Sequence, residues 1–159
     1  ADCYRKGAEK YVADETALTR TGVSATREFD SDDLRSRQKD GVWKSSVHLL
    51  ENMQKAPALI IPCIESRFEN EDVFTQASMY GSILPATWSL MLALRARRIA
   101  SAWTSLHLIY EEEAAKLLGI PNDITQAALL PVAWLKGGDL GRAKRLPLED
   151  VCYYNSWGS

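Results

Sequence analysis

The sequence predicts an α+β fold, with a central sheet flanked by helices, and three observations lead to this prediction. Residues 75–98 repeat apolar side chains at helical spacing over several turns. Two short apolar runs, residues 58–64 and 124–135, are bounded by proline or glycine, which is typical of buried strands. Helical and extended segments alternate along the chain, an order that also fits an α/β fold.

The segment 75–98 is expected to be the central helix. Its apolar stripe is wide enough that the helix should be covered by the rest of the molecule or by a second subunit. The stripe steps by four and three residues through Met79, Ile83, Ala86, Leu90 and Ala93. Pro85 removes one backbone hydrogen bond and is expected to bend this helix.

Three further helices are expected to flank the sheet. Residues 1–18 present one apolar side with charges between the apolar positions. The pair Ser45-Ser46 is expected to cap a helix that runs to about Lys55. Residues 110–118 form a short helix that Gly119 closes.

The remaining chain is assigned to strands and to one long connection. Residues 58–64, 100–108 and 124–135 are the predicted strands, and Pro131 indicates an edge or a bulge in the last of them. Residues 19–40 are polar and charged. They are interpreted either as a mobile loop or lid over a binding site or as a disordered segment.

Composition and charge argue against several classes of partner and site. The chain has 159 residues and a formal net charge of -2, so it offers no electrostatic reason to expect nucleic acid or an anionic membrane as a partner. The three cysteines are far apart and form no CxxC pair, which argues against a disulfide framework and against a structural zinc site. Free thiols in a reducing compartment predict a cytoplasmic location.

No sequence motif supports cofactor-free catalysis. The chain contains no GxSxG elbow, no GxGxxG and no phosphate-binding Walker loop. The three glutamates at 111–113 are interpreted as helix-start residues favoured by the helix dipole rather than as catalytic carboxylates. We therefore expect no catalytic residue and no metal ligand in the sequence, and we expect any chemistry to come from a bound cofactor.

Four blocks, in order, resemble the FMN-dependent nitroreductase family and together span about half the chain. Each block is short, and their order and spacing make the resemblance specific. The first block is 80–86 (YGSILPA), and the second is 94–97 (LRAR) leading to 101–107 (SAWTSLH). The third is 118–121 (LGIP) followed by 127–133 (AALLPVA), and the fourth is 143–148 (AKRLPL).

The resemblance implies a nitroreductase-like three-layer α+β fold over residues 1–159, with the long central helix at a homodimer interface. It implies one FMN per active site and NAD(P)H as co-substrate. The acceptor would be a small molecule such as a nitroaromatic compound or a quinone. A protein acid or nucleophile is not required for that reaction, which agrees with the absence of catalytic motifs.

Carried over position by position, the resemblance implies two cofactor-binding segments. Thr104, Ser105 and Leu106 match the turn that runs along the flavin ring, where a backbone N–H can stabilise negative charge. Lys144 and Arg145 match the basic pair that holds the FMN phosphate. An ordinary strand edge and a solvated basic loop are the respective alternatives. Weaker candidates, which could equally be packing residues, are Trp103, Ser82 and Pro85.

Two departures from the family pattern qualify what the resemblance implies. The family usually opens with an Arg-rich motif and a flavin-binding loop, and residues 1–40 have neither, so the chain is interpreted as N-terminally truncated. The family also has glycines at the positions of Arg98 and Ala100, where glycine permits positive φ. Two alternatives therefore stay open: a truncated, flavin-free paralogue that acts as a binding module, and a relative that stores or modifies FMN itself.

Overall fold

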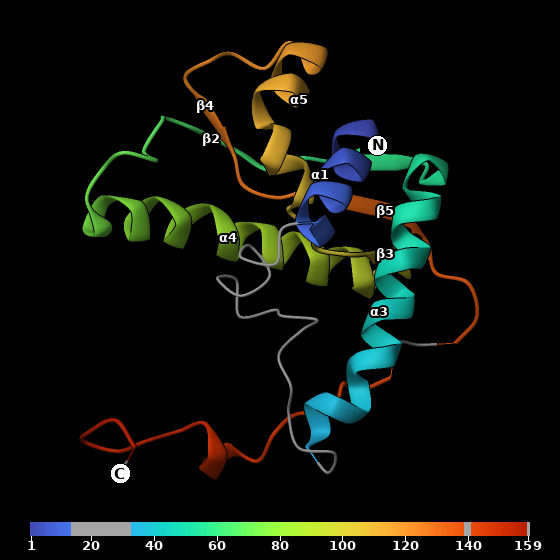
Figure 1. The fold of residues 1–159 in the computed structure, drawn as a ribbon, viewed down its shortest axis with the longest axis vertical. Coiled ribbons are helices and arrows are strands. Elements are labelled where there is room, and N and C mark those ends of the chain that lie inside the picture. The colour runs from blue at the N-terminus through green and yellow to red at the C-terminus, as the bar shows by residue number, and fades with distance from the viewer. Residues whose placement is uncertain (14–32, 139–140, 159) are drawn as a thin grey trace.

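The computed structural model describes residues 1–13, 33–138 and 141–158 of the chain (Figure 1). These parts contain four α-helices, three short 3₁₀ helices and five strands. The α-helices are α1 (Asp2–Ala13), α3 (Leu34–Asn52), α4 (Val73–Ala96) and α5 (Glu111–Leu118). The strands are β1 (Ala58–Ile60), β2 (Cys63–Glu65), β3 (Ile99–Ser101), β4 (Ile124–Gln126) and β5 (Leu130–Trp134). The 3₁₀ helices are η1 (Met53–Lys55), η2 (Leu106–Tyr110) and η3 (Leu148–Asp150).

Two small sheets are built from these strands, and every strand pair in them is antiparallel. β5 lies between β1 and β3 in the first sheet, and β2 pairs with β4 in the second. The antiparallel pairing confirms the α+β class over the α/β alternative. The chain leaves one sheet for the other at residues 61–62 and again at residues 127–129, so each of the two long predicted strands is in fact two short ones.

Two details of the predicted strands are wrong. Pro131 lies in the central strand and not at an edge. A proline is tolerated there because the side on which an N–H would point faces Ala102, beyond the end of β3. The carbonyl of Pro131 still accepts a hydrogen bond from the Ala102 amide at 3.4 Å. The predicted strand 100–108 ends at Ser101, and η2 begins at Leu106.

The core lies where α1, the end of α3 and η2 meet the first sheet. Tyr4, Met53 and Leu129 form its buried centre, and the half-buried side chains packed against them are Leu49, Leu50, Ile61 and Leu106. α1 lies directly against η2 (Figure 1). The contact is so close that a Cβ at Gly7 would stand 2.0 Å from the carbonyl oxygen of Leu106.

Helix α3 begins well before the predicted start. Asp33 is its N-cap and accepts a hydrogen bond from the Arg35 amide at 2.7 Å, so the prediction of a cap at Ser45-Ser46 is wrong. Both serines lie inside the helix, on a stretch that is exposed on all sides. Of the expected lid at 19–40, residues 33–40 are the cap and first turns of α3. Residues 19–32 lie outside the described part of the chain.

The central helix α4 is present almost as predicted, with Asp72 as its N-cap and Pro85 inside it. Its apolar surface, however, is not covered by the described parts of the chain, in which Thr87 is its one buried residue. Val73, Phe74 and Trp88 are all more than half exposed. The helix has 24 residues and a mean hydropathy of 1.2 in its most apolar window, enough by length and composition to cross a membrane. A helix buried in protein can meet the same two criteria.

The short helix α5 is confirmed at both ends. Its first turn holds Glu111, Glu112 and Glu113, where the partial positive charge of the helix N-terminus favours carboxylates. Gly119 ends the helix in the left-handed conformation, with φ of 68°.

Arg98 has a positive φ, although it is not a glycine. Its φ is 60°, a region that glycine adopts freely and a side chain resists. The residue makes the turn from α4 into β3, and its guanidinium donates to the Gly137 carbonyl at 3.0 Å. The strain lies at one of the two positions where the nitroreductase family has glycine.

We expect Arg98→Gly to raise the free energy of unfolding by about 1 kcal/mol, because glycine adopts the left-handed conformation without the steric cost of a Cβ. Arg97→Gly is the matched control, since Arg97 also donates to one backbone carbonyl but has φ of -103°. The control should lose about 0.5–1 kcal/mol. Urea denaturation of both variants measures their free energies of unfolding. If the two variants lose the same stability, the turn is not strained.

Candidate functional site

The turn predicted to lie along the flavin ring, residues 104–106, is tightly fixed to the sheet. Thr104 and Leu129 exchange backbone hydrogen bonds of 3.1 and 2.8 Å, which hold the turn against the segment between β4 and β5. Ser105 is exposed, and Trp103 before it is 38% exposed. This turn is therefore held in place and is exposed at Ser105, as a ligand-contacting segment must be.

Leu106 fixes the other end of the same turn. Its side chain packs against the core formed by Tyr4, Met53 and Leu129, and its carbonyl oxygen lies against Gly7 of α1. The Leu108 amide then donates to the Ser105 carbonyl at 2.9 Å and starts η2. The position of Ser105 consequently depends on how α1 packs.

Lys144 and Arg145 lie in an extended, exposed segment beside the first half of α3. Gln38 Nε2 donates to the Lys144 carbonyl oxygen at 3.5 Å, and Arg145 Nη1 lies 3.3 Å from the same oxygen. Both side chains are exposed, which suits cations that bind a phosphate. The chain continues from here along the outside of the molecule to the carboxyl end (Figure 1).

Within one chain, the two predicted cofactor-binding segments lie towards opposite ends of α3. Lys144 contacts Gln38, whereas Leu106 packs into the core that Leu49 and Leu50 reach from the last turns of the helix. Eleven helical residues separate Gln38 from Leu49, a rise of about 17 Å. A single copy therefore does not bring the two segments together.

Ser82 and Pro85 lie on the exposed surface of α4, not in a packed pocket wall. The Ser82 hydroxyl donates to the Met79 carbonyl at 2.9 Å, within the helix itself. These two residues belong to the same uncovered surface as Trp88. They could contact a ligand that binds against this face of α4, or a second chain that covers it.

The structure also contains a polar centre that the sequence analysis did not find. Arg67, after β2, binds Glu111 of α5 through Nη1 to Oε1 at 2.9 Å and Nη2 to Oε2 at 3.1 Å. The backbone N–H of Gln126 also donates to Glu111 Oε1, at 3.0 Å. The side-chain amide of Gln126 donates to the Glu111 carbonyl at 3.1 Å. Glu111 therefore joins α5 to both strands of the second sheet.

The electrostatics of this centre follow from its partners. Hydrogen bonds to Glu111 and Glu69 raise the pKa of the Arg67 guanidinium above its ordinary value. Burial lowers the pKa of His107, which precedes this centre in η2, to about 4. Sequence alone gave no signal for the group, because Arg67 stands in a polar connector and 44 residues separate it from Glu111.

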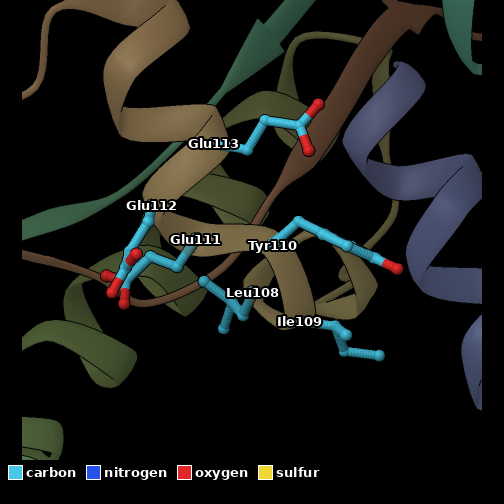
Figure 2. Close-up of a pocket in the computed structure, with 6 residues that line it drawn as sticks. All are labelled: Leu108, Ile109, Tyr110, Glu111, Glu112 and Glu113. Atoms are coloured by element: carbon cyan, nitrogen blue, oxygen red, sulfur yellow. The ribbon is translucent and has the colours of Figure 1, made fainter.

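A surface hollow of about 370 Å³ lies above this centre and is lined by residues 108–113 (Figure 2). Glu111 and Glu112 point to one side of it, and Glu113 points to the other (Figure 2). Glu113 pairs with Lys6 of α1 at 2.5 Å, and this hydrogen bond raises the pKa of Lys6. Within the described residues no group of histidine, cysteine and carboxylate side chains could hold a metal ion. Two of the three carboxylates at the hollow are paired with cations, Glu111 with Arg67 and Glu113 with Lys6.

No family model matches the chain.

Proposed function

We propose that the chain is the scaffold of an FMN-dependent oxidoreductase of the nitroreductase type. It would use NAD(P)H to reduce a nitroaromatic compound, a quinone or a similar acceptor. The observation that supports this best is the backbone at Arg98: the chain adopts a glycine-like conformation at a position where the family has glycine. The turn that follows leads to Ser105, the position that the four sequence blocks align with the flavin ring.

The residues of this chain suit FMN only as two separate halves. The exposed cations Lys144 and Arg145 fit a phosphate, and the fixed, accessible backbone at Ser105 fits a flat polar ring. Bound FMN would supply the hydride-transfer chemistry. The protein's part would be to hold the phosphate, fix the ring and limit access of water.

Because the halves are apart in one chain, we propose that the working form is a homodimer whose sites combine the two copies. The apolar surface of α4 that the described residues leave exposed supports this, since monomeric proteins rarely expose large apolar patches. Exposed apolar residues of the carboxyl-terminal segment, among them Trp157 at 92%, add to the surface that a second copy could cover.

The proposal is tested by adding FMN to the purified protein. We expect a yellow complex with absorbance near ~450 nm and a stability increase of about 2.7 kcal/mol when FMN is at a hundred times its dissociation constant. Lys144→Ala/Arg145→Ala should weaken binding by about 100-fold or more, because each of the two lost charged hydrogen bonds costs roughly 1.5–3 kcal/mol. Lys116→Ala, on α5, is the exposed-cation control and should bind as the parent does. A melting temperature that does not change when FMN is added would contradict the proposal.

One observation favours a second candidate, a flavin-free paralogue that serves as a binding module. It is the distance between the Ser105 turn and Lys144 within one chain. Titration calorimetry with FMN separates the two functions, because micromolar or tighter binding excludes the second. If FMN does not bind, the uncovered α4 surface becomes the place to look for a protein partner.

A further inference from the structure

Among the described residues, neither ring nitrogen of the buried His107 makes a hydrogen bond of acceptable geometry, although the Gln126 side chain lies close enough to raise the pKa of the imidazole. Only 2% of the residue is exposed, and both Nδ1 and Nε2 lie out of contact with water. The neighbouring Gln126 is equally buried, and its side-chain oxygen Oε1 also lacks a partner among the described residues. Buried polar atoms in native proteins are nearly always paired, so three unpaired atoms at one place need an explanation.

Both side chains are held where they are by the surrounding structure. Gln126 is fixed at its backbone N–H and at its side-chain NH₂, each of which donates to Glu111. His107 follows Leu106, which packs against the core and against Gly7 of α1. The imidazole therefore lies between η2 and β4, and neither element can turn away to hydrate it without breaking other contacts.

Burial governs the charge state of this imidazole. It lowers the pKa of His107 to about 4, against the attraction of Glu111 and the opposing effect of the Gln126 side chain, and with a small repulsion from the amino group at Ala1. The other nearby cations are already paired, Arg67 with Glu111 and Lys6 with Glu113. An imidazolium has two N–H donors, and Gln126 Oε1 could accept only one of them.

We propose that His107 is an acid-sensitive latch that holds η2, and with it the turn at residues 104–106, against β4. The neutral imidazole stays in its buried place. Uptake of one proton from solvent leaves a buried N–H without an acceptor, so the ring moves out to water and the turn is released from Leu129. This inference depends on the fold and not on the proposed flavin chemistry.

The direction of the pH effect follows from the two pKa values. The folded-state pKa of His107 is about 4 and its ordinary value is 6.5. Its contribution to the closed form is complete above pH 6.5 and is lost as the pH falls towards 4. The ratio of released to latched protein should therefore rise by about 300-fold at most over that interval, and by roughly 50-fold between pH 7 and pH 4.5.

Two measurements on the complete chain without FMN test the latch. An NMR titration of the two imidazoles follows His107 directly, with His48 on the exposed side of α3 as the second signal. Amide hydrogen exchange, corrected for its intrinsic pH dependence, follows the release. The Thr104 amide donates to the Leu129 carbonyl and the Leu108 amide donates to the Ser105 carbonyl, and both should exchange roughly 50-fold faster at pH 4.5 than at pH 7. Amides inside α4 should not change.

Variants separate the latch from general acid unfolding. His107→Leu removes the titrating group, so exchange at Thr104 should no longer depend on pH beyond the intrinsic term, whereas His48→Leu should respond as the parent does. An unchanged acid response in His107→Leu overturns the proposal. Should that variant fail to fold, the parent titration decides: an imidazole of His107 that titrates near 6.5, or turn amides with equal exchange at both pH values, also overturns it.

Discussion

Gly7→Ala should lower the free energy of unfolding by about 3 kcal/mol, because among the described glycines Gly7 is the one whose added Cβ would meet another atom within 4 Å. The added Cβ would lie 2.0 Å from the Leu106 carbonyl oxygen and 2.8 Å from its carbonyl carbon. Those atoms are backbone, and they cannot move aside because the Leu106 side chain packs against Tyr4 and Leu129. The variant must instead push α1 away from η2.

Gly41→Ala is the matched control. Gly41 lies in the exposed part of α3, and a Cβ there would meet nothing within 4 Å. The same substitution should therefore stabilise the protein by about 0.5–1 kcal/mol, because alanine loses less conformational entropy in a helix. Denaturant unfolding of both variants under one set of conditions measures the contrast. If Gly7→Ala proved as harmless as Gly41→Ala, then α1 would not pack on η2 as described.

The effect of Gly7→Ala on ligand binding would also be informative. The turn proposed to face the flavin ring ends at Leu106, so displacing α1 should weaken FMN binding in addition to lowering stability. Arg98→Gly should not, because it relieves the backbone that leads into the turn without filling space around it. A comparison of the two variants thus distinguishes a site that depends on the packing of α1 from one that does not.

Elements whose signal is local could be predicted from the sequence. The helix α5 carries its own start and stop signals, three carboxylates and Gly119, and both operate as expected. The long apolar repeat of α4 identified the helix to within a few residues. The mixed class of the fold followed from these helices and from the apolar runs that contain β1 and β5.

Elements whose limits depend on distant parts of the chain could not be predicted. Residues 39–46 of α3 are exposed on all sides, so this stretch has no apolar face from which periodicity could reveal a helix. The cap was therefore predicted at Ser45-Ser46, which lie inside the helix, and the cap at Asp33 was missed. The run 58–64 gave no indication that it would divide between two sheets, because the division is made by the separate partners β5 and β4.

The arrangement of the candidate site also depends on contacts between distant parts of the chain. Resemblance located the turn at Ser105 and the basic pair at Lys144, yet only the structure shows that they lie towards opposite ends of α3. The contacts that fix the turn join Gly7 to Leu106, and those that fix α5 join Arg67 to Glu111. Neither pair shares a periodicity or a motif, since each arises when two elements far apart in sequence meet.

Glu111→Ala should cost about 2 kcal/mol, the second large effect expected among these variants. The substitution leaves the Arg67 guanidinium without its main partner and the Gln126 N–H, inside the structure, without an acceptor. The estimate is moderate because the side chains of Arg67 and Glu111 are 35% and 20% exposed and water can partly replace the pair. Glu112→Ala, one residue along and exposed, is the control and should change stability by less than ~0.5 kcal/mol.

A double-mutant cycle assigns that loss to its cause. Arg67→Ala alone should cost about 1–2 kcal/mol, and the double variant should cost less than the sum by about 1 kcal/mol if the ion pair is formed in solution. Additive losses would show that the two side chains act separately. The remaining loss in Glu111→Ala would then belong to the Gln126 N–H.

Cys63 provides a probe of the same carboxylate that does not depend on stability. Burial, and after it the charge of Glu111, raise the pKa of the Cys63 thiol. Because the thiolate is the reactive form, removal of Glu111 should speed alkylation of Cys63 at neutral pH, while removal of Glu112 should not. Mass spectrometry of the Cys63 peptide after timed alkylation measures this apart from Cys3 and Cys152. An unchanged rate in the folded Glu111→Ala variant would place the carboxylate too far from β2 to join α5 to the second sheet.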